Sequence, residues 1–200
     1  MGSADASRPV DIEVAQPGPL STDSAATIEL PQPSTLGAAQ VGSGFPRAAE
    51  GAMSQLIAID RAAIESVSVV TAQDVITAWA ADGGPTARDW SGVVAVRTLL
   101  EGAGLPANGA SALTVQLEPA MGKIVESGSD STTVCVDFIL TASVQGAQSD
   151  RIAVADCQHM AWQTDRWMIA TGPEAEPMPS LWPGTQESIN AGYQWLEVLP

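Results

Sequence analysis

Positive charge is scarce in this chain. Of its 200 residues only 8 are Lys or Arg, against 23 Asp or Glu, so the formal net charge is -15. A field of this sign repels the phosphate backbone of DNA or RNA and the anionic surface of a membrane. We therefore expect no direct nucleic-acid partner and no binding to an anionic lipid surface.

Long apolar runs are missing as well. No run approaches the roughly 18 residues needed to cross a bilayer, so the protein should be soluble as it stands. Residues 1–3 look like an expression start, and residues 197–200 resemble the remnant of a tag. We therefore expect contact with a membrane only through an N-terminal anchor that is missing from this sequence.

Cysteine and histidine are also rare, being limited to Cys135, Cys157 and His159. Two cysteines fit one disulfide in an oxidising compartment at least as well as two reduced thiols. A proton shuttle working near neutral pH would have to use His159 or a carboxylate. The chain has no CxxC pair, no HxxxH helix motif, no GxGxxG after a strand and no P-loop, so nucleotide binding has no support.

Residues 1–43 have the composition of a linker, rich in Pro, Ser, Ala and Gly with mostly acidic charges. The apolar alternation at Ile28 and Leu30 could dock as an edge strand. Too little apolar surface is present, however, to offset the entropy lost on ordering. We expect residues 1–43 to be a flexible acidic linker, largely disordered, before a single domain over residues 44–196.

Three helices are predicted at the start of this domain. The first follows Pro46 and has apolar residues at spacings of three and four from Ala52 to Val67, which indicates a face turned to the core. Each of the next two helices opens with a Thr followed three residues later by an Asp, a variant of the capping box. These caps are Thr71 with Asp74 and Thr86 with Asp89.

From Ala112 the apolar period changes to two, which predicts strands at about residues 113–117, 134–144, 152–162 and 167–169. The short connections around Gly128 and Gly146 require antiparallel neighbours. A last helix is predicted after the cap Thr185, carrying Tyr193 and Leu196. The fold class is therefore α+β, with N-terminal helices packed on a curved antiparallel sheet of about four strands.

The second and third predicted strands hold the residues with the most reactive side chains. Cys135 and Asp137 share one face of their strand, and Cys157 and His159 share one face of theirs. If Gly146 lies at the centre of the turn, Cys135 stands opposite Cys157. Opposed residues can have Cα atoms about 4.5 Å apart, which is short but compatible with a disulfide.

Other interpretations of this group remain open. Cys135, Asp137, Cys157 and His159 offer donors that suit zinc, but four ligands on a two-stranded ribbon lie nearly in one plane. A catalytic pair of Cys157 and His159 lacks a third group to orient the ring. We expect a Cys135–Cys157 disulfide ahead of reduced core thiols, a metal site or catalysis, and we assign no catalytic residue, metal or cofactor.

Three further residues are candidates for a cavity or an interaction surface. His159 is most simply a strand residue facing a helix. Glu118 could pair with Asp137 across neighbouring strands, although a solvated acidic face also explains both. Trp182 lies in a proline-rich crossing segment that it either pins down or uses to face a partner.

Five strings in the chain resemble a family of mostly uncharacterised actinobacterial proteins associated with conjugative and integrative elements. The resemblance covers about residues 44–196. The strings are GFPRAAEGAMSQLIAID at residues 44–60, LEPAMG at 117–122, CVDF at 135–138, VADCQ at 154–158 and WPGT at 182–185.

That resemblance implies a membrane-anchored protein with an external domain of the NTF2-like or cystatin-like cone type, similar to the scaffold subunits of type IV secretion channels. It implies a non-enzymatic docking role on the outer side of the cytoplasmic membrane, through contacts with protein components of a transfer complex or by self-association. It carries no catalytic residues. The alternative is a small-molecule binder or enzyme that uses the cavity between helices and sheet, which a deep pocket around His159 or Glu118 would favour.

Overall fold

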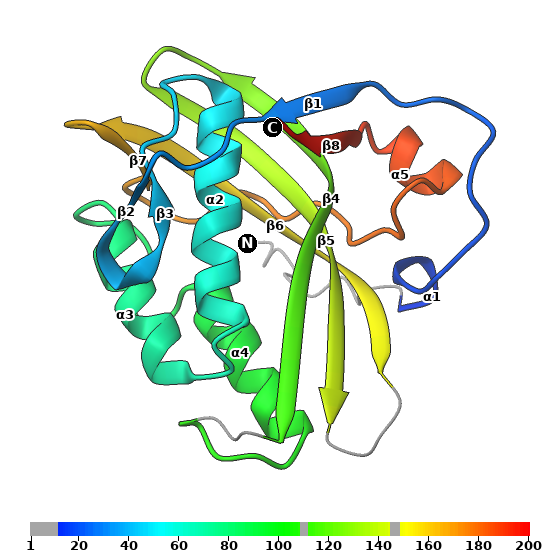
Figure 1. Cartoon of the computed structure of the whole chain (residues 1–200), viewed down its shortest axis with the longest axis horizontal. Helices are drawn as coiled ribbons and strands as arrows, with labels where there is room; N and C mark the ends of the chain where they lie inside the picture. The colour runs from blue at the N-terminus through cyan, green and yellow to red at the C-terminus, as the bar shows by residue number, and fades with distance from the viewer. Residues whose placement is uncertain (1–11, 109–111, 145–148) are drawn as a thin grey trace, which may run out of the picture.

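The computed structural model describes residues 12–108, 112–144 and 149–200. It is an α+β structure in which a strongly curled sheet carries helices on its inner face (Figure 1). In the described residues this sheet has six strands in the order β1-β8-β4-β5-β6-β7. The neighbours are antiparallel except β1 and β8, which are parallel.

Helix α2 (Ala49–Ile64) lies against the sheet, and α3 (Val69–Trp79) and α4 (Ser91–Gly102) lie beside it. The predicted core-facing stripe of α2 is confirmed. Because the helix is covered by the sheet on one side and by its neighbours on the other, residues on most of its circumference are buried. The buried stripe includes Ala52, Leu56, Ile59, Ala63 and, just beyond the helix, Val67.

The two predicted helix caps are displaced from the true helix starts. Helix α3 begins earlier, because the Ser68 hydroxyl accepts a hydrogen bond from the Thr71 backbone N–H at 3.3 Å. Thr71 is thus the capped residue rather than the cap. Thr86 donates its backbone N–H and its hydroxyl to Asp89, both at 2.7 Å, within a turn that ends before α4 begins.

The predicted antiparallel meander is present as β4 (Leu113–Ser127), β5 (Ser131–Val144), β6 (Asp150–Gln163) and β7 (Arg166–Ile169). Strand β4 runs well past its predicted end. Register shifts after Pro119 and after Ile124 interrupt the alternation of apolar residues, which hid this extension in the sequence. The predicted turn at Gly146 lies outside the described residues.

Two strands beyond the expected four come from opposite ends of the chain. β1 (Thr27–Leu30) belongs to the segment expected to be a linker, and β8 (Gln194–Val198) lies where a helix was expected. They pair in parallel, so Ile28 and Leu30 are only 6% and 3% exposed. Residues 27–30 are therefore docked as a strand, whereas the sequence predicted disorder there. The sequence did not reveal β8, which provides the edge to which β1 pairs.

The other elements of the N-terminal segment are short. They are helix α1 (Ile12–Ala15), the paired strands β2 (Thr35–Leu36) and β3 (Gly42–Ser43), and the 3-10 turn η1 (Ala38–Gln40). Trp79 fixes this region to the helices, since its indole N–H donates to the Ala38 carbonyl at 3.0 Å. Residues 1–11 lie outside the described residues.

The last predicted helix is shorter than expected. Thr185 caps α5 (Gln186–Asn190), and its hydroxyl accepts from the Ser188 N–H at 3.3 Å. The helix ends before Gly192, whose φ of 86° is a left-handed conformation that terminates helices. Tyr193 and Leu196 therefore lie beyond the helix, and Leu196 belongs to β8.

The sheet is covered on both faces. The main core lies between the helices and the inner face. A second, smaller core lies on the other face beneath the segment over residues 173–185, which we call the crossing segment. This second core consists of Met121, Cys135, Cys157, Ala175, Leu181 and Tyr193.

Candidate functional site

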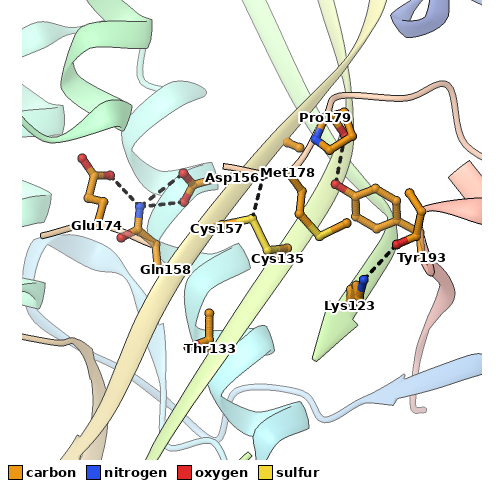
Figure 2. Close-up of a disulfide and its surroundings, with 12 residues drawn as sticks. Lys123, Thr133, Cys135, Asp156, Cys157, Gln158, Glu174, Met178, Pro179 and Tyr193 are labelled. Atoms are coloured by element: carbon orange, nitrogen blue, oxygen red, sulfur yellow. Dashed lines mark hydrogen bonds between the residues drawn. A yellow bond between two sulfur atoms is a disulfide. The ribbon is translucent and has the colours of Figure 1, made fainter. Parts of the chain in front are cut away.

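The predicted disulfide is confirmed. Cys135 stands opposite Cys157 in the β5–β6 register and the two are bonded, with Cα atoms 4.1 Å apart. The Met178 backbone N–H of the crossing segment donates to the Cys157 sulfur at 3.4 Å (Figure 2). Because both sulfurs are in the disulfide, neither is available as a thiolate ligand or nucleophile.

His159 lies in an open hollow rather than facing a helix. Its Nδ1 is 2.8 Å from the Thr133 hydroxyl, and its backbone carbonyl accepts from the Ala170 N–H. The hollow also contains Lys123, Glu126 and Glu176. In the described part of the chain the ring is hydrogen-bonded to the Thr133 hydroxyl and to no carboxylate.

Glu118 and Asp137 do not form the carboxylate pair considered above. Glu118 is exposed and stands opposite Ile139, while Asp137 stands opposite Met121 and is fully buried. Glu118 instead lies in a groove along the free edge of β4, together with Arg61 and Glu65.

Trp182 anchors the crossing segment. Its backbone N–H donates to the Val14 carbonyl at 2.7 Å, and the Arg151 guanidinium lies 5.5 Å from the centre of its ring. The side chain is half-buried. These contacts join the crossing segment to α1 and β6, so Trp182 acts as a pin in this structure.

A cavity of about 120 Å³ lies between α2, α4 and the inner face of β5 and β6, where the alternative function expected one, but the sequence did not predict the polar residues that line it. Its walls are mainly apolar, from Ile64, Phe138, Leu140 and Val154, and three polar residues also line it: Asp60, Ser91 and Asp156. Neither His159 nor Glu118 lines it.

Three separate elements bring carboxyl groups together beside this cavity. Asp60 comes from α2, Asp156 from β6, and Glu174 from the crossing segment; we call these three residues the acid cluster. Gln158 joins two of them, because its side-chain nitrogen donates to Glu174 at 2.7 Å and to Asp156 at 3.0 Å (Figure 2). The Ser91 hydroxyl also contacts both Glu174 and Asp156.

Glu174 serves as the cap of α4. The N-cap residue Trp90 makes no side-chain cap. Instead, the Ser91 backbone N–H donates to the two carboxylate oxygens of Glu174, at 3.1 and 3.3 Å. A carboxylate is favoured at this position because helix N-termini carry partial positive charge.

Burial raises the pKa values of the other two acids. The pKa of Asp156 is raised to about 6, chiefly by burial and further by the charge of Glu174, while hydrogen bonds from Gln158 and Ser91 oppose the rise. The pKa of Asp60 is raised well above its usual value by burial and by the neighbouring charges of Asp156 and Glu174. Burial thus favours the protonated form of Asp60, and a positive charge beside it would oppose this effect.

Asp60 is also short of partners. It is 1% exposed, and its Oδ2 atom has no hydrogen-bond partner in the described structure. The ion pairs recorded among the described residues are Arg47 with Asp130 and Arg61 with Glu65. Neither involves the acid cluster, so no Lys or Arg side chain among those residues balances its charge.

The sequence held one signal for this cluster. Asp60 lies four residues after Leu56 and four before Ile64, so a carboxyl group interrupts the apolar face of α2. Glu174 gave no such signal, because its position depends on where the crossing segment passes β6.

A second buried acid lies on the other face of the sheet. Burial raises the pKa of Asp137 to about 8, and the backbone of Leu181 opposes the rise. Among the residues that the structure describes, neither Asp137 oxygen has a partner in good hydrogen-bond geometry. Burial raises the pKa of nearby Tyr193, and the charge of Asp137 raises it further.

The described residues contain no group of three or more His, Cys, Asp or Glu side chains arranged to hold a metal ion. No helix in the described ranges has the length and apolar character needed to cross a membrane. The chain matches no protein-family model, no curated protein and no solved structure.

Proposed function

We propose that this chain is a non-enzymatic docking domain of the NTF2-like or cystatin-like cone type. In this proposal it works on the outer face of the cytoplasmic membrane, anchored there in the full-length protein, and takes part in a conjugative DNA-transfer apparatus through protein contacts. The resemblance of residues 44–196 supports the setting, and the helices laid on a curled sheet support the cone. The disulfide supports an oxidising compartment, because disulfides persist mainly outside the cytoplasm.

The observation that carries a docking role is the open outer edge of β4. Strand β8 pairs with β4 only at Met121 and Gly122, so residues 113–119 have no strand beside them in the described structure. The Leu117 N–H points outward to the Glu65 carboxylate at 2.9 Å. Since alternate residues point to the same edge, the backbone of Val115 also faces outward.

An open edge of this kind can accept an extended segment of another protein as an added strand. The groove beside it, lined by Arg61, Glu65 and Glu118, gives side chains of that segment a place to lie. The chain carries a net charge of -15, so a basic segment of a channel component is the favoured occupant. Glu65 holds the Leu117 N–H that such a strand would take over.

Site-specific photo-crosslinking in donor cells tests this proposal. A photoreactive residue replaces Gln116, which is exposed on β4, and a control places it at Glu187, which is exposed on α5. We expect position 116 alone to crosslink to a component of the transfer apparatus identified by mass spectrometry. Crosslinks only to a second copy of this chain would replace the channel component with self-association, and equal or absent crosslinking at both positions would refute docking at β4.

A second candidate function is the binding of a small molecule between the helices and the sheet. The cavity lined by Asp60, Ser91 and Asp156 favours it, because small-molecule sites are typically apolar hollows with a few converging polar groups. The polar groups differ from those expected, since His159 and Glu118 lie elsewhere. Saturable binding of a small ligand that is lost when the cavity is altered tests this candidate.

A further inference from the structure

We propose that this cavity binds a small organic ammonium ion, a primary amine with an apolar body, whose charged nitrogen lies against Asp60 and Asp156. The proposal specifies the ligand class for the second candidate function and is independent of docking at β4. It starts from the polar end of the cavity, which Asp60 lines and where the buried Oδ2 atom of Asp60 has no hydrogen-bond partner among the described residues.

Asp60 is the residue that calls for a ligand. Buried polar atoms nearly always have hydrogen-bond partners, and exceptions require an explanation. The Oδ2 atom of Asp60 is buried without a partner, and Asp60 lines the cavity. An ammonium group carries three donors, which can satisfy this oxygen and also reach the neighbouring carboxylate of Asp156.

The charge balance points to a cation rather than a neutral group. Asp156 already accepts from Gln158, and Glu174 accepts from Gln158 and Ser91, but these donors are all neutral. The two recorded ion pairs of the described residues lie away from the acid cluster. A bound ammonium ion would supply the positive charge that the protein does not.

The walls and size of the cavity define the remainder of the ligand. A volume of about 120 Å³ equals that of roughly four water molecules in the liquid. The side chains of Ile64, Phe138, Leu140 and Val154 surround this space. A compact alkyl body of about four carbons therefore fits beside them, whereas a bare metal ion would leave these walls unfilled.

The binding should depend on pH. The groups that face the site are Asp60 from α2, Ser91 from α4, Asp156 and Gln158 from β6, and Glu174 from the crossing segment. Because burial raises the pKa of Asp156 to about 6, more of this carboxyl is ionised as the pH rises through 6, and ammonium affinity should rise with it. The cation should also lower the raised pKa of Asp60, so binding should release protons.

Titration calorimetry with isobutylamine and its neutral counterpart isobutanol tests the proposal on the whole chain. At pH 8 we expect saturable one-to-one binding of the amine, at least tenfold tighter than that of the alcohol. Repeating the titration in buffers of different ionisation enthalpy should show proton release. Lowering the pH to 5 should weaken amine binding at least tenfold.

Variants locate the site. Asp60→Asn keeps the shape and removes the charge, and should weaken amine binding at least tenfold while leaving alcohol binding unchanged. Asp156→Asn should act in the same direction and serves in its place if Asp60→Asn does not fold. Glu118→Gln removes one exposed acid outside the cavity and should change nothing.

The outcomes test the ligand class, the small-molecule function and the location of the site separately. If the alcohol binds as tightly as the amine, the cavity is a binding site but the ammonium class is wrong. If neither probe binds, both the ammonium class and the small-molecule function fail, and docking at β4 is unaffected. If Asp60→Asn and Asp156→Asn bind the amine as the original chain does, the acid cluster is not the site.

Discussion

Cys135 and Cys157 join β5 to β6 directly beneath the crossing segment, whose Met178 N–H donates to the Cys157 sulfur. The disulfide therefore closes a loop within the chain and also lies at the centre of the second core. Its position couples the central strands of the sheet to the segment that carries Glu174. This relationship leads to the first prediction.

Replacing both cysteines with alanine should lower the free energy of unfolding by about 3 kcal/mol. The bond joins residues 22 apart in the sequence, and closing a loop of that length restricts the unfolded chain by roughly this amount. Urea denaturation of the oxidised chain and of the Cys135→Ala, Cys157→Ala chain measures the difference. Dithiothreitol should destabilise only the original chain; a loss below about 1 kcal/mol would contradict the prediction.

The N-terminal segment gives the second prediction. Leu30 is 3% exposed on β1, whereas Leu36 is 64% exposed on β2. Leu30→Ala should lower the free energy of unfolding by about 2–5 kcal/mol, because it leaves a cavity in the main core. Leu36→Ala is the matched control and should change it by less than about 0.5 kcal/mol.

A loss of less than about 0.5 kcal/mol for Leu30→Ala would mean that packing of β1 contributes little to stability. The segment over residues 12–43 would then behave as the linker expected from its composition. Thermal or urea unfolding of purified variants is sufficient to decide.

The sequence predicted those features that depend on neighbours along the chain. The spacing of apolar residues predicted the stripe of α2, and the period of two predicted the meander and the pairing of Cys135 with Cys157. The caps of α3 and α4 were misplaced because the Thr and Asp residues in the pattern form other local hydrogen bonds.

Features that depend on contacts between distant segments were not predictable in this way. The pairing of Ile28 with Leu196 joins segments near the two ends of the chain. Neither strand has a sequence pattern that identifies the strand with which it pairs. The acid cluster likewise combines residues from α2, β6 and the crossing segment. Of these residues only Asp60 could be noticed in the sequence, because its carboxyl group lies on an otherwise apolar helix face.

Asp137 gives the third prediction, a loss of stability with rising pH. Its pKa is about 8 in the folded chain, against a usual value of 3.8. Between these values the folded chain holds a proton that the unfolded chain has released, so the free energy of unfolding falls as the pH rises from about 4 to about 8. Asp137→Asn stays neutral and should remove this part of the dependence, up to about 1.4 kcal/mol per pH unit.

Urea denaturation at pH 5, 6, 7 and 8 measures this slope for the original chain and for Asp137→Asn. Some slope should remain in the variant, because burial also raises the pKa values of Asp60 and Asp156. Asp74→Asn, on the exposed side of α3, is the control and should leave the slope unchanged. An Asp137→Asn chain with the full original slope would show that Asp137 is ionised in the folded protein.

Glu174 gives the last prediction, because capping and charge repulsion there act in opposite directions. Glu174→Ala removes the acceptor for the Ser91 N–H and for the Gln158 side chain, and it also relieves repulsion with Asp156. Asp156, with a pKa of about 6, is about half ionised at pH 6 and mostly ionised at pH 7, so the repulsion is present at pH 7. The hydrogen bonds to the charged Glu174 and the helix cap together outweigh it, so we expect a net loss of about 2 kcal/mol at pH 7.

Glu176→Ala is the matched control, an exposed acid two residues along the same crossing segment, and should be neutral within about 0.5 kcal/mol. Hydrogen exchange separates the two effects, since only the loss of a cap should speed exchange at the Ser91 amide. If Glu174→Ala instead raises the free energy of unfolding, repulsion within the acid cluster dominates. The acid cluster would then lower the stability of the fold through electrostatic repulsion, and a bound cation would reduce that repulsion.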